Sequence, residues 1–355
     1  MPGQATQGPH SKLQNSQNCL RHRAPSLVSL AIEGKYPETS HDSRSPGYAS
    51  DVPGEETSCA LRAMSARAAR TPTSNFSGVV VLLKNYTSSE GLLEDFSEIE
   101  QISDHMKKHE KPVGEPEFGY YLAGLIEAGG YFGDQLLEIL FFEKDITLAY
   151  YVKKRIGYGS VYFIKDKRAV KYVLRHTAGL KYVLDLVNGK FLTNCKINQL
   201  LKHDYGSKFA GGAEILPPAN FSLMTNHYLA GFTDSDGYFG ISTPKDKSSK
   251  LGIRVRLRFV LGQKDPTILQ KVKSEFGGSL YHYKSTDNYL LELSSLLQNL
   301  KVIEYFDKFN LNSIKHLAFF KWRKAYRIVQ RKEHLTEKGL LKIKLLGKSI
   351  SELIK

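Results

Sequence analysis

The sequence predicts an α+β fold that arose by internal duplication. First, one motif occurs twice, as YYLAGLIEAGGYFG from Tyr120 to Gly133 and as HYLAGFTDSDGYFG from His227 to Gly240. Second, both copies are followed by segments with helical spacing that alternate with short runs typical of strands. Third, a segment rich in Gly and Pro, residues 204–222, separates the two copies. These observations predict two similar units joined by a linker.

The first unit opens with a helix that Pro116 can start and that ends at Gly129 and Gly130. After it the pattern predicts a strand, a helix, a hairpin and two helices, over residues 136–142, 146–156, 160–174, 180–187 and 196–203. Small residues within the motif helix would let a second backbone approach closely. Two motif helices, one per unit, are therefore expected to pack side by side and to bring their C-terminal ends together.

The second unit repeats this order. Thr225 or Asn226 can cap its motif helix. A hairpin, a helix, a second hairpin and two helices are expected over residues 237–261, 266–276, 279–293, 296–306 and 315–330. Gly237 and Gln263 are 26 positions apart, whereas Gly130 and Glu143 are 13 apart. The first unit is thus expected to lack about one strand's worth of hairpin.

Charge is unevenly distributed along the chain, which has a formal net charge of +14 over 355 residues. Residues 1–110 hold 11 Lys or Arg and 13 Asp or Glu, whereas residues 111–355 hold 39 and 23. A basic folded region favours a polyanionic partner, and nucleic acid is the first candidate. No apolar run reaches 18 residues, so no membrane span is expected. The three cysteines are far apart and fit neither a metal site nor a disulfide framework.

One predicted strand carries a row of arginines. In residues 253–259, apolar side chains alternate with Arg254, Arg256 and Arg258. Because successive side chains of a strand point to opposite faces, the three arginines are expected to share the face away from the core. Such a row can contact phosphates and guanine edges. The matching strand of the first unit, residues 136–142, is apolar with one acid, Glu138.

The doubled motif resembles that of LAGLIDADG homing endonucleases and of the related group I intron maturases, in their single-chain form. The resemblance covers about the last two-thirds of the chain. It implies two pseudo-symmetric αββαββα repeats whose antiparallel sheets form a saddle over nucleic acid. Together with composition along the chain, it predicts five segments: a mostly disordered N-terminal extension, repeat 1, a linker, repeat 2 and a basic tail, over residues 1–110, 111–203, 204–222, 223–331 and 332–355.

The eighth letter of the motif is the functional acid of this family, and here the two copies differ. It is Asp236 in the second copy and Gly129 in the first. The resemblance implies that Asp236 binds a divalent metal, with Mg²⁺ suited to its oxygen donors. Glu127 is a poor substitute for the missing acid, because a residue two positions earlier on a helix points about 200° away.

Other family positions can be matched one at a time. Lys196 and Lys315 resemble the basic residues that assist cleavage near each active centre. Gln263 resembles a residue that holds water beside the metal ligand, and Glu143 is its counterpart in the first copy.

Three functions fit these residues. One is an intron-encoded homing endonuclease that binds an asymmetric double-stranded DNA site, with cleavage reduced to nicking at most because of Gly129. The second is a maturase that folds group I intron RNA without nuclease activity, and the third is a decaying reading frame. The resemblance implies a monomer with internal pseudo-two-fold symmetry and an origin in mitochondria.

Overall fold

The computed structural model describes residues 101–355 except 107, 166, 210, 213 and 355. All of the described residues belong to one compact unit. Most of the N-terminal extension predicted over residues 1–110 lies outside the described residues. Its expected disorder therefore stays a prediction.

Repeat 1 begins with the first motif helix, α3 (Glu115–Gly129). Strands β1 (Gly130–Gly133) and β2 (Leu136–Phe142) follow, then the short η1 (Glu143–Asp145) and helix α4 (Ile146–Ile156), strands β3 (Ser160–Ile164) and β4 (Ala169–Leu174), and helices α5 (Thr177–Val187), α6 (Asn194–Lys202) and α7 (Tyr205–Phe209). Its strands form an antiparallel sheet in the order β1-β2-β4-β3.

Repeat 2 follows the same plan after the short η2 (Leu223–Thr225). It comprises the second motif helix α8 (Tyr228–Asp236), strands β5 (Gly237–Ser242) and β6 (Arg256–Gln263), helix α9 (Thr267–Phe276), strands β7 (Ser279–Tyr283) and β8 (Asn288–Leu293), and helices α10 (Leu296–Lys308), α11 (Lys315–Gln330) and α12 (Glu337–Ile354), with η3 (Glu333–Leu335) before the last. Its sheet has the matching order β5-β6-β8-β7. The duplicated αββαββα fold is confirmed.

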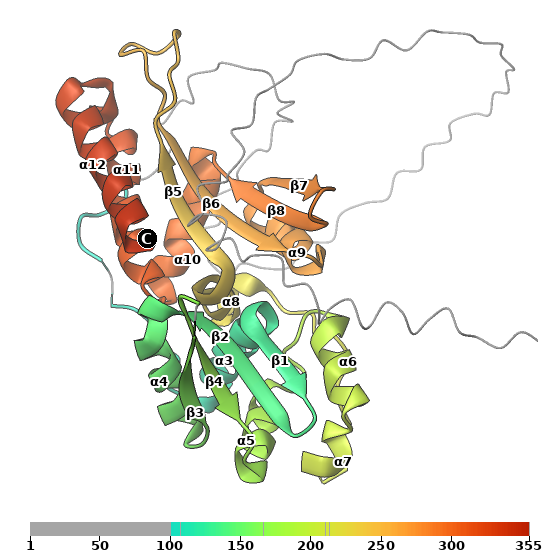
Figure 1. Ribbon diagram of the computed structural model, residues 1–355. Coiled ribbons are helices and arrows are strands. Elements are labelled where there is room, and N and C mark those ends of the chain that lie inside the picture. The colour runs from blue at the N-terminus through green and yellow to red at the C-terminus, as the bar shows by residue number, and fades with distance from the viewer. Residues whose placement is uncertain (1–100, 107, 166, 210, 213, 355) are drawn as a thin grey trace, which may run out of the picture. The chain divides into compact units, whose positions relative to one another are not determined.

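The two motif helices lie side by side between the sheets (Figure 1). Two glycines allow this contact. A Cβ atom at Gly124 would lie 2.0 Å from the carbonyl oxygen of Tyr228, and one at Gly231 would lie 1.9 Å from that of Tyr121. Only a residue without a side chain fits at such a distance, so the small third letter of each motif copy brings the backbones of α3 and α8 into contact.

The segment before α3 connects the repeats. The amide of Ile102 donates to Gln330 in α11, and the amide of Glu110 donates to the carbonyl of Lys308 at 2.8 Å. Further along, Arg155 of α4 donates to the carbonyls of Pro112 and Val113. Residues 101–113 therefore bind the last helices of repeat 2 before the chain enters repeat 1.

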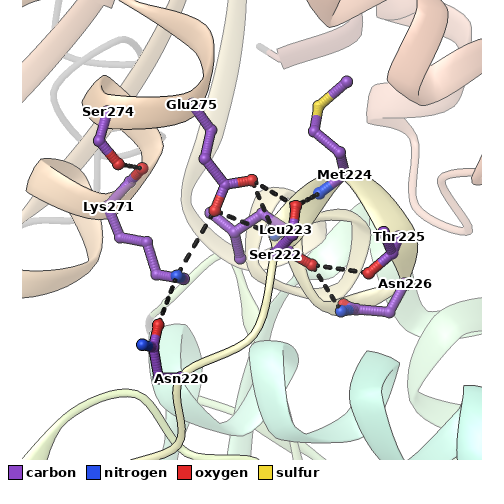
Figure 2. Close-up of polar contacts among 9 residues, drawn as sticks. All are labelled: Asn220, Ser222, Leu223, Met224, Thr225, Asn226, Lys271, Ser274 and Glu275. Atoms are coloured by element: carbon purple, nitrogen blue, oxygen red, sulfur yellow. Dashed lines mark hydrogen bonds and ion pairs between the residues drawn. The ribbon is translucent and has the colours of Figure 1, made fainter. Parts of the chain in front are cut away.

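The linker ends in a set of polar contacts that fix the start of α8 (Figure 2). Glu275 of α9 accepts hydrogen bonds from the Ser222 hydroxyl and the Leu223 amide, each at 2.9 Å. The Asn226 side chain donates to the carbonyl of Ser222 and accepts from the amide of Tyr228. Asn226 therefore holds the first residue of α8, although the N-cap position itself is His227.

Two details of the second repeat differ from expectation. The extra residues between Gly237 and Gln263 do not add a strand, because each sheet has four. They form the long connection 243–255 between β5 and β6, so the first repeat lacks a loop rather than a strand. Strand β6 also begins only at Arg256, which leaves Arg254 in that connection. Sequence spacing alone does not separate a longer strand from a longer loop.

The basic tail forms α12, which packs against α11 and β5. Its residues Ile343 and Ile350 are fully buried, while Lys144 of repeat 1 donates to the carbonyls of Glu352 and Leu353 at its C-terminal end. Among the described residues, no helix has the length and apolar character needed to cross a membrane.

Candidate cleavage centre and nucleic-acid interface

The end of the second motif helix brings two predicted site residues together. Asp236 is the last residue of α8, and Gln263 is the last residue of β6. The Gln263 amide nitrogen donates to Asp236 Oδ2 at 2.7 Å. This bond orients the carboxylate at the C-terminal end of the helix, where the negative end of the helix dipole favours a cation.

The corresponding place in repeat 1 has no carboxylate. Gly129 is the last residue of α3 and is buried. A Cβ atom built there would lie 2.4 Å from the hydroxyl oxygen of Ser235 and 3.3 Å from the carbonyl oxygen of Leu140. Ser235, the seventh letter of the other motif copy, thus occupies part of the space that an acid at position 129 would need.

Glu127, the sixth letter of the first copy, has a structural role. Its carboxylate accepts hydrogen bonds from the amides of Leu192 and Thr193, at 2.9 and 2.8 Å, and from the Thr193 hydroxyl. A fourth donor is the hydroxyl of Tyr228, which comes from the second motif helix. Burial raises the pKa of Glu127, and these donors offset part of that effect. As expected, Glu127 points away from the metal position, and it fixes the start of α6.

Asp234 repeats this arrangement in the second copy. It accepts from the amides of Asn312 and Ser313, at 2.8 and 3.1 Å, and from the Ser313 hydroxyl. The crossing donor is Tyr121 of the first motif helix, at 2.7 Å. Burial raises the pKa of Asp234, again partly offset by hydrogen bonds. Each motif helix therefore donates one tyrosine hydroxyl to the buried acid of the other.

The two predicted basic residues contact the C-terminal ends of the motif helices α8 and α3. Lys315 begins α11, and its amine donates to the carbonyls of Thr233, Asp234 and Ser235 at 3.0, 3.0 and 2.6 Å. The amine of Lys196 donates to the carbonyl of Gly130. Both side chains are buried, at 7% and 8% exposure. As the structure places them, these amines satisfy backbone carbonyls at the ends of the motif helices, and their contact with phosphate remains a prediction.

Asp145 was missed by the sequence analysis. It is 3% exposed, lies in η1 of repeat 1 and accepts a hydrogen bond at 2.6 Å from the amide of Ile314, next to Lys315 of repeat 2. It lines a small cavity with Lys315 and Tyr238. Burial raises the pKa of Asp145 to about 6, although Lys315 acts in the opposite direction. The matching Asp265 instead accepts from the amide of Thr267 in its own repeat. The contact of Asp145 with Ile314 joins distant segments, so the local sequence does not reveal it.

The remaining predicted residues are more scattered. Glu143 is half exposed, with its carboxylate 4.0 Å from Arg168. Arg256 is exposed on β6, and Arg258 lies 3.6 Å from Glu292 of β8. Only Arg256 and Arg258 of the predicted row lie within strand β6. Arg254 precedes the strand, and a carboxylate from the neighbouring strand pairs with Arg258.

The donor set fits a metal ion at one repeat end only. Asp236 offers carboxylate oxygens, and Mg²⁺ commonly takes one or two carboxylates and completes its shell with water and phosphate oxygens. At position 129 there is no side-chain oxygen. Within the described part of the chain, no group of three or more His, Cys, Asp or Glu could hold a metal by itself.

Comparison with known proteins agrees with the duplicated fold. The family model for LAGLIDADG endonuclease matches residues 229–326. An uncharacterized cox1 intron-2 37.2 kDa protein of Schizosaccharomyces pombe is 41% identical over 268 residues, which cover 74% of this chain and 81% of that protein. Probable intron-encoded endonuclease 4 of Neurospora crassa is 26% identical over 235 residues, covering 64% of this chain but only 43% of that protein.

A solved structure shares the architecture. The I-LtrWI LAGLIDADG homing endonuclease bound to target DNA superimposes with a TM-score of 0.53 at 19% identity, over 66% of this chain and 97% of that chain. Two αββαββα repeats joined through paired motif helices define this class of fold. The chain belongs to the LAGLIDADG endonuclease family.

Proposed function

We propose that this protein is an intron-encoded homing endonuclease that binds a double-stranded DNA target and cuts at most one strand. The observation that carries the proposal is the unequal pair of motif ends. Asp236 is oriented by Gln263, whereas Gly129 faces Ser235. One half can therefore hold a metal ion for hydrolysis and the other cannot.

The chain's own residues prepare the single centre for its task. Gln263 fixes the Asp236 carboxylate, and Lys315 holds the last carbonyls of α8, so the carboxylate projects from a rigid helix end. A bound Mg²⁺ would neutralise charge on the attacking and leaving phosphate oxygens. Asp236 would hold the ion, and Gln263 would orient a water molecule beside it.

Double-stranded DNA is the proposed partner because of charge and of the fold's known use. The described repeats lie in the basic part of the chain, and Arg256 is exposed on the sheet of repeat 2. The homing endonuclease with a similar fold is described as bound to target DNA. The proposal includes a monomer, because one chain contains both halves, and a mitochondrial origin, because the relative from Schizosaccharomyces pombe comes from a cox1 intron. The five segments predicted from the sequence remain part of the proposal.

The alternative is a maturase for group I intron RNA. It is favoured by one observation: the first motif has lost its acid while its buried contacts, from Gly124 to the Tyr228–Glu127 bond, are intact. RNA folding needs a stable basic surface and no hydrolysis. A splicing assay on the host intron with and without the protein separates the two functions.

The direct test uses a supercoiled plasmid that carries the intron-less junction of the reading frame's insertion site. With Mg²⁺, wild-type protein should convert it to nicked circles without linear product. Asp236→Asn should lower the nicking rate at least about 100-fold, since even residues that only support a metal ligand cost roughly 10–100-fold when replaced. Clean linearisation by the wild type would contradict the proposed loss of one centre. Absence of DNA binding, together with intron splicing that depends on the protein, would favour the maturase.

A further inference from the structure

The outward face of the first sheet is unusually apolar for a surface that would contact DNA. In β2 the buried side chains Leu137, Ile139 and Phe141 alternate with outward ones, so Leu136 and Leu140 point away from the core. Strand register places Val173 of β4 and Tyr162 and Ile164 of β3 on the same side. We call Leu136, Leu140, Tyr162, Ile164 and Val173 the apolar face.

The apolar face is not part of the hydrophobic core. None of its five side chains belongs to the buried cluster or to the apolar side chains that pack against that cluster. All five are partly exposed, and Tyr162 is 52% exposed. They are therefore free of the packing role that usually explains apolar residues in a sheet.

Charge within this face is paired, while cations lie at its end, where Arg168 is 4.0 Å from Glu143. Glu138 and Lys171 point outward and form an ion pair at 2.9 Å, so neither offers an unpaired charge. Beyond them, the turn between β3 and β4 carries the exposed cations Lys165, Lys167 and Arg168. An apolar centre with cations at its rim matches a major groove, in which base edges lie between two phosphate backbones.

The second sheet presents different chemistry at the matching place. Its outward positions include Arg256 and Arg258 of β6, the second paired with Glu292, beside the apolar Leu290 of β8 and Tyr281 of β7. Arginine offers forked donors that suit guanine, whereas the apolar face offers no donor except the Tyr162 hydroxyl and the paired Lys171. The second sheet therefore has arginine donors for guanine edges that the first sheet lacks.

We infer that the sheet of repeat 1 recognises thymine methyl groups and that its DNA half-site is rich in thymine. The thymine 5-methyl group is the apolar feature of the major-groove edges. An apolar side chain that covers a guanine or cytosine edge would leave donors or acceptors buried without partners, which is costly. This inference rests on the proposed DNA binding and adds which bases each half prefers.

The test begins with selection of bound duplexes from a random library with the full chain. A second selection with Arg256→Ala then shows which half-site repeat 2 contacts. Base preference should weaken in that half-site only. In the selected duplex, thymines are then replaced by deoxyuridine, which removes the methyl group and changes nothing else at the base edge. Binding is measured by fluorescence anisotropy at fixed salt.

We expect deoxyuridine in the repeat 1 half-site to weaken binding about fourfold for each methyl group in contact, the equivalent of one buried methyl group. The same replacement in the other half-site should change affinity less than twofold. Val173→Thr, which exchanges one methyl group for a hydroxyl, should reduce the discrimination between thymine and uracil in the repeat 1 half alone. Its unfolding temperature would verify that the variant is folded.

Each contrary outcome is distinct. A repeat 1 half-site rich in guanine or cytosine, or equal loss from deoxyuridine in both halves, overturns the inference and leaves DNA binding intact. If no duplex is enriched from the library at all, the proposed function fails as well.

Discussion

Asp236 and Gly129, the residues at the eighth position of the two motif copies, differ in their surroundings as well as in their side chains. Asp236 is held by Gln263, whereas Gly129 lies against the Ser235 hydroxyl. The nearest atom to the added carbon is the Ser235 hydroxyl oxygen, so the obstruction comes from one small side chain. Restoring an acid to repeat 1 therefore requires attention to Ser235 as well as to Gly129.

The buried Asp145 gives a prediction about pH. Its pKa is raised to about 6 from 3.8, because burial disfavours the charged form in the folded state. The protonated form therefore favours folding, and this contribution is complete below about pH 4 and is lost as pH rises through about 6. The Asn side chain of Asp145→Asn stays neutral at every pH. The difference between the two pKa values of Asp145 corresponds to a cost in the free energy of unfolding of about 3 kcal/mol at neutral pH.

We expect the variant to gain stability over the wild type as pH rises from about 4 to 7, by up to about 3 kcal/mol, in urea unfolding at several pH values. Lys315 and Asp234 also act on Asp145, so the gain is an upper limit. Asp265→Asn is the matched control, because Asp265 is exposed and has no burial cost to lose. A difference between variant and wild type that stays constant with pH would contradict this account.

Site residues were predictable where the motif fixes a position along one helix. The motif's resemblance to the family singled out Asp236 and Gly129, and helical spacing predicted that the Glu127 side chain leaves the helix on another side. Ser235 facing Gly129 depends on the register between two helices, and Asp145 reaches Ile314 across the repeats. Contacts between distant segments leave no periodic signal, so sequence patterns do not report them.

The paired motif helices α3 and α8 are the central element of the fold. Gly124 and Gly231 let their backbones touch, and Tyr121 and Tyr228 each donate to the buried acid of the opposite repeat. The pair thus joins the repeats and also fixes the helix starts that carry Lys196 and Lys315.

Replacing one of these glycines should separate the helices. A methyl group at Gly231 would lie 1.9 Å from the backbone oxygen of Tyr121, which cannot rotate away. We expect Gly231→Ala to lower the free energy of unfolding by about 3 kcal/mol or more, as overpacking of a rigid contact does. Urea unfolding followed by circular dichroism measures this.

Gly347→Ala in α12 is the control for helix propensity. Its nearest contact, to Ile241, is 3.4 Å from the added carbon, so the substitution should stabilise the protein by up to about 1 kcal/mol. Destabilisation by both variants to the same extent would show that close approach of α3 and α8 is not the cause.

The order of elements was predictable because hydrophobic spacing and Gly or Pro boundaries are local. Helices α3, α4 and α9 begin or end where Pro116, Gly157 and Gly277 predict. The start of β6 was not, because residues 253–255 alternate like a strand although they precede it.

At the scale of the whole molecule, the duplication produces two similar sheets with unequal surfaces. The outward side of one is apolar with a neutralised Glu138–Lys171 pair, and that of the other carries Arg256. The sequence showed this asymmetry in the two strands. It did not show that residues 101–113 and α12 each contact both repeats.

DNA affinity should respond to salt in a way that reflects these surfaces. Arg256→Ala should reduce the slope of log affinity against log salt by about 1, because each positive charge lost from the interface displaces about one counterion fewer from the DNA. Arg258→Ala should reduce it less, since Glu292 already pairs with that side chain. Anisotropy titrations between about 50 and 200 mM salt give the slopes. Identical slopes for both variants and the wild type would exclude the sheet of repeat 2 from the interface.

The central claim is that one cleavage centre was lost while the scaffold kept its DNA-binding form. The most direct measurement compares wild type, Gly129→Asp, Ser235→Ala and the double variant Gly129→Asp with Ser235→Ala on the supercoiled target plasmid with Mg²⁺. The account predicts nicked circles from the wild type and from Ser235→Ala, little linear product from Gly129→Asp alone, and linear DNA from the double variant, which gains an acid and the space for it. Linear DNA from the wild type, or a double variant that binds the target and only nicks it, would contradict the claim.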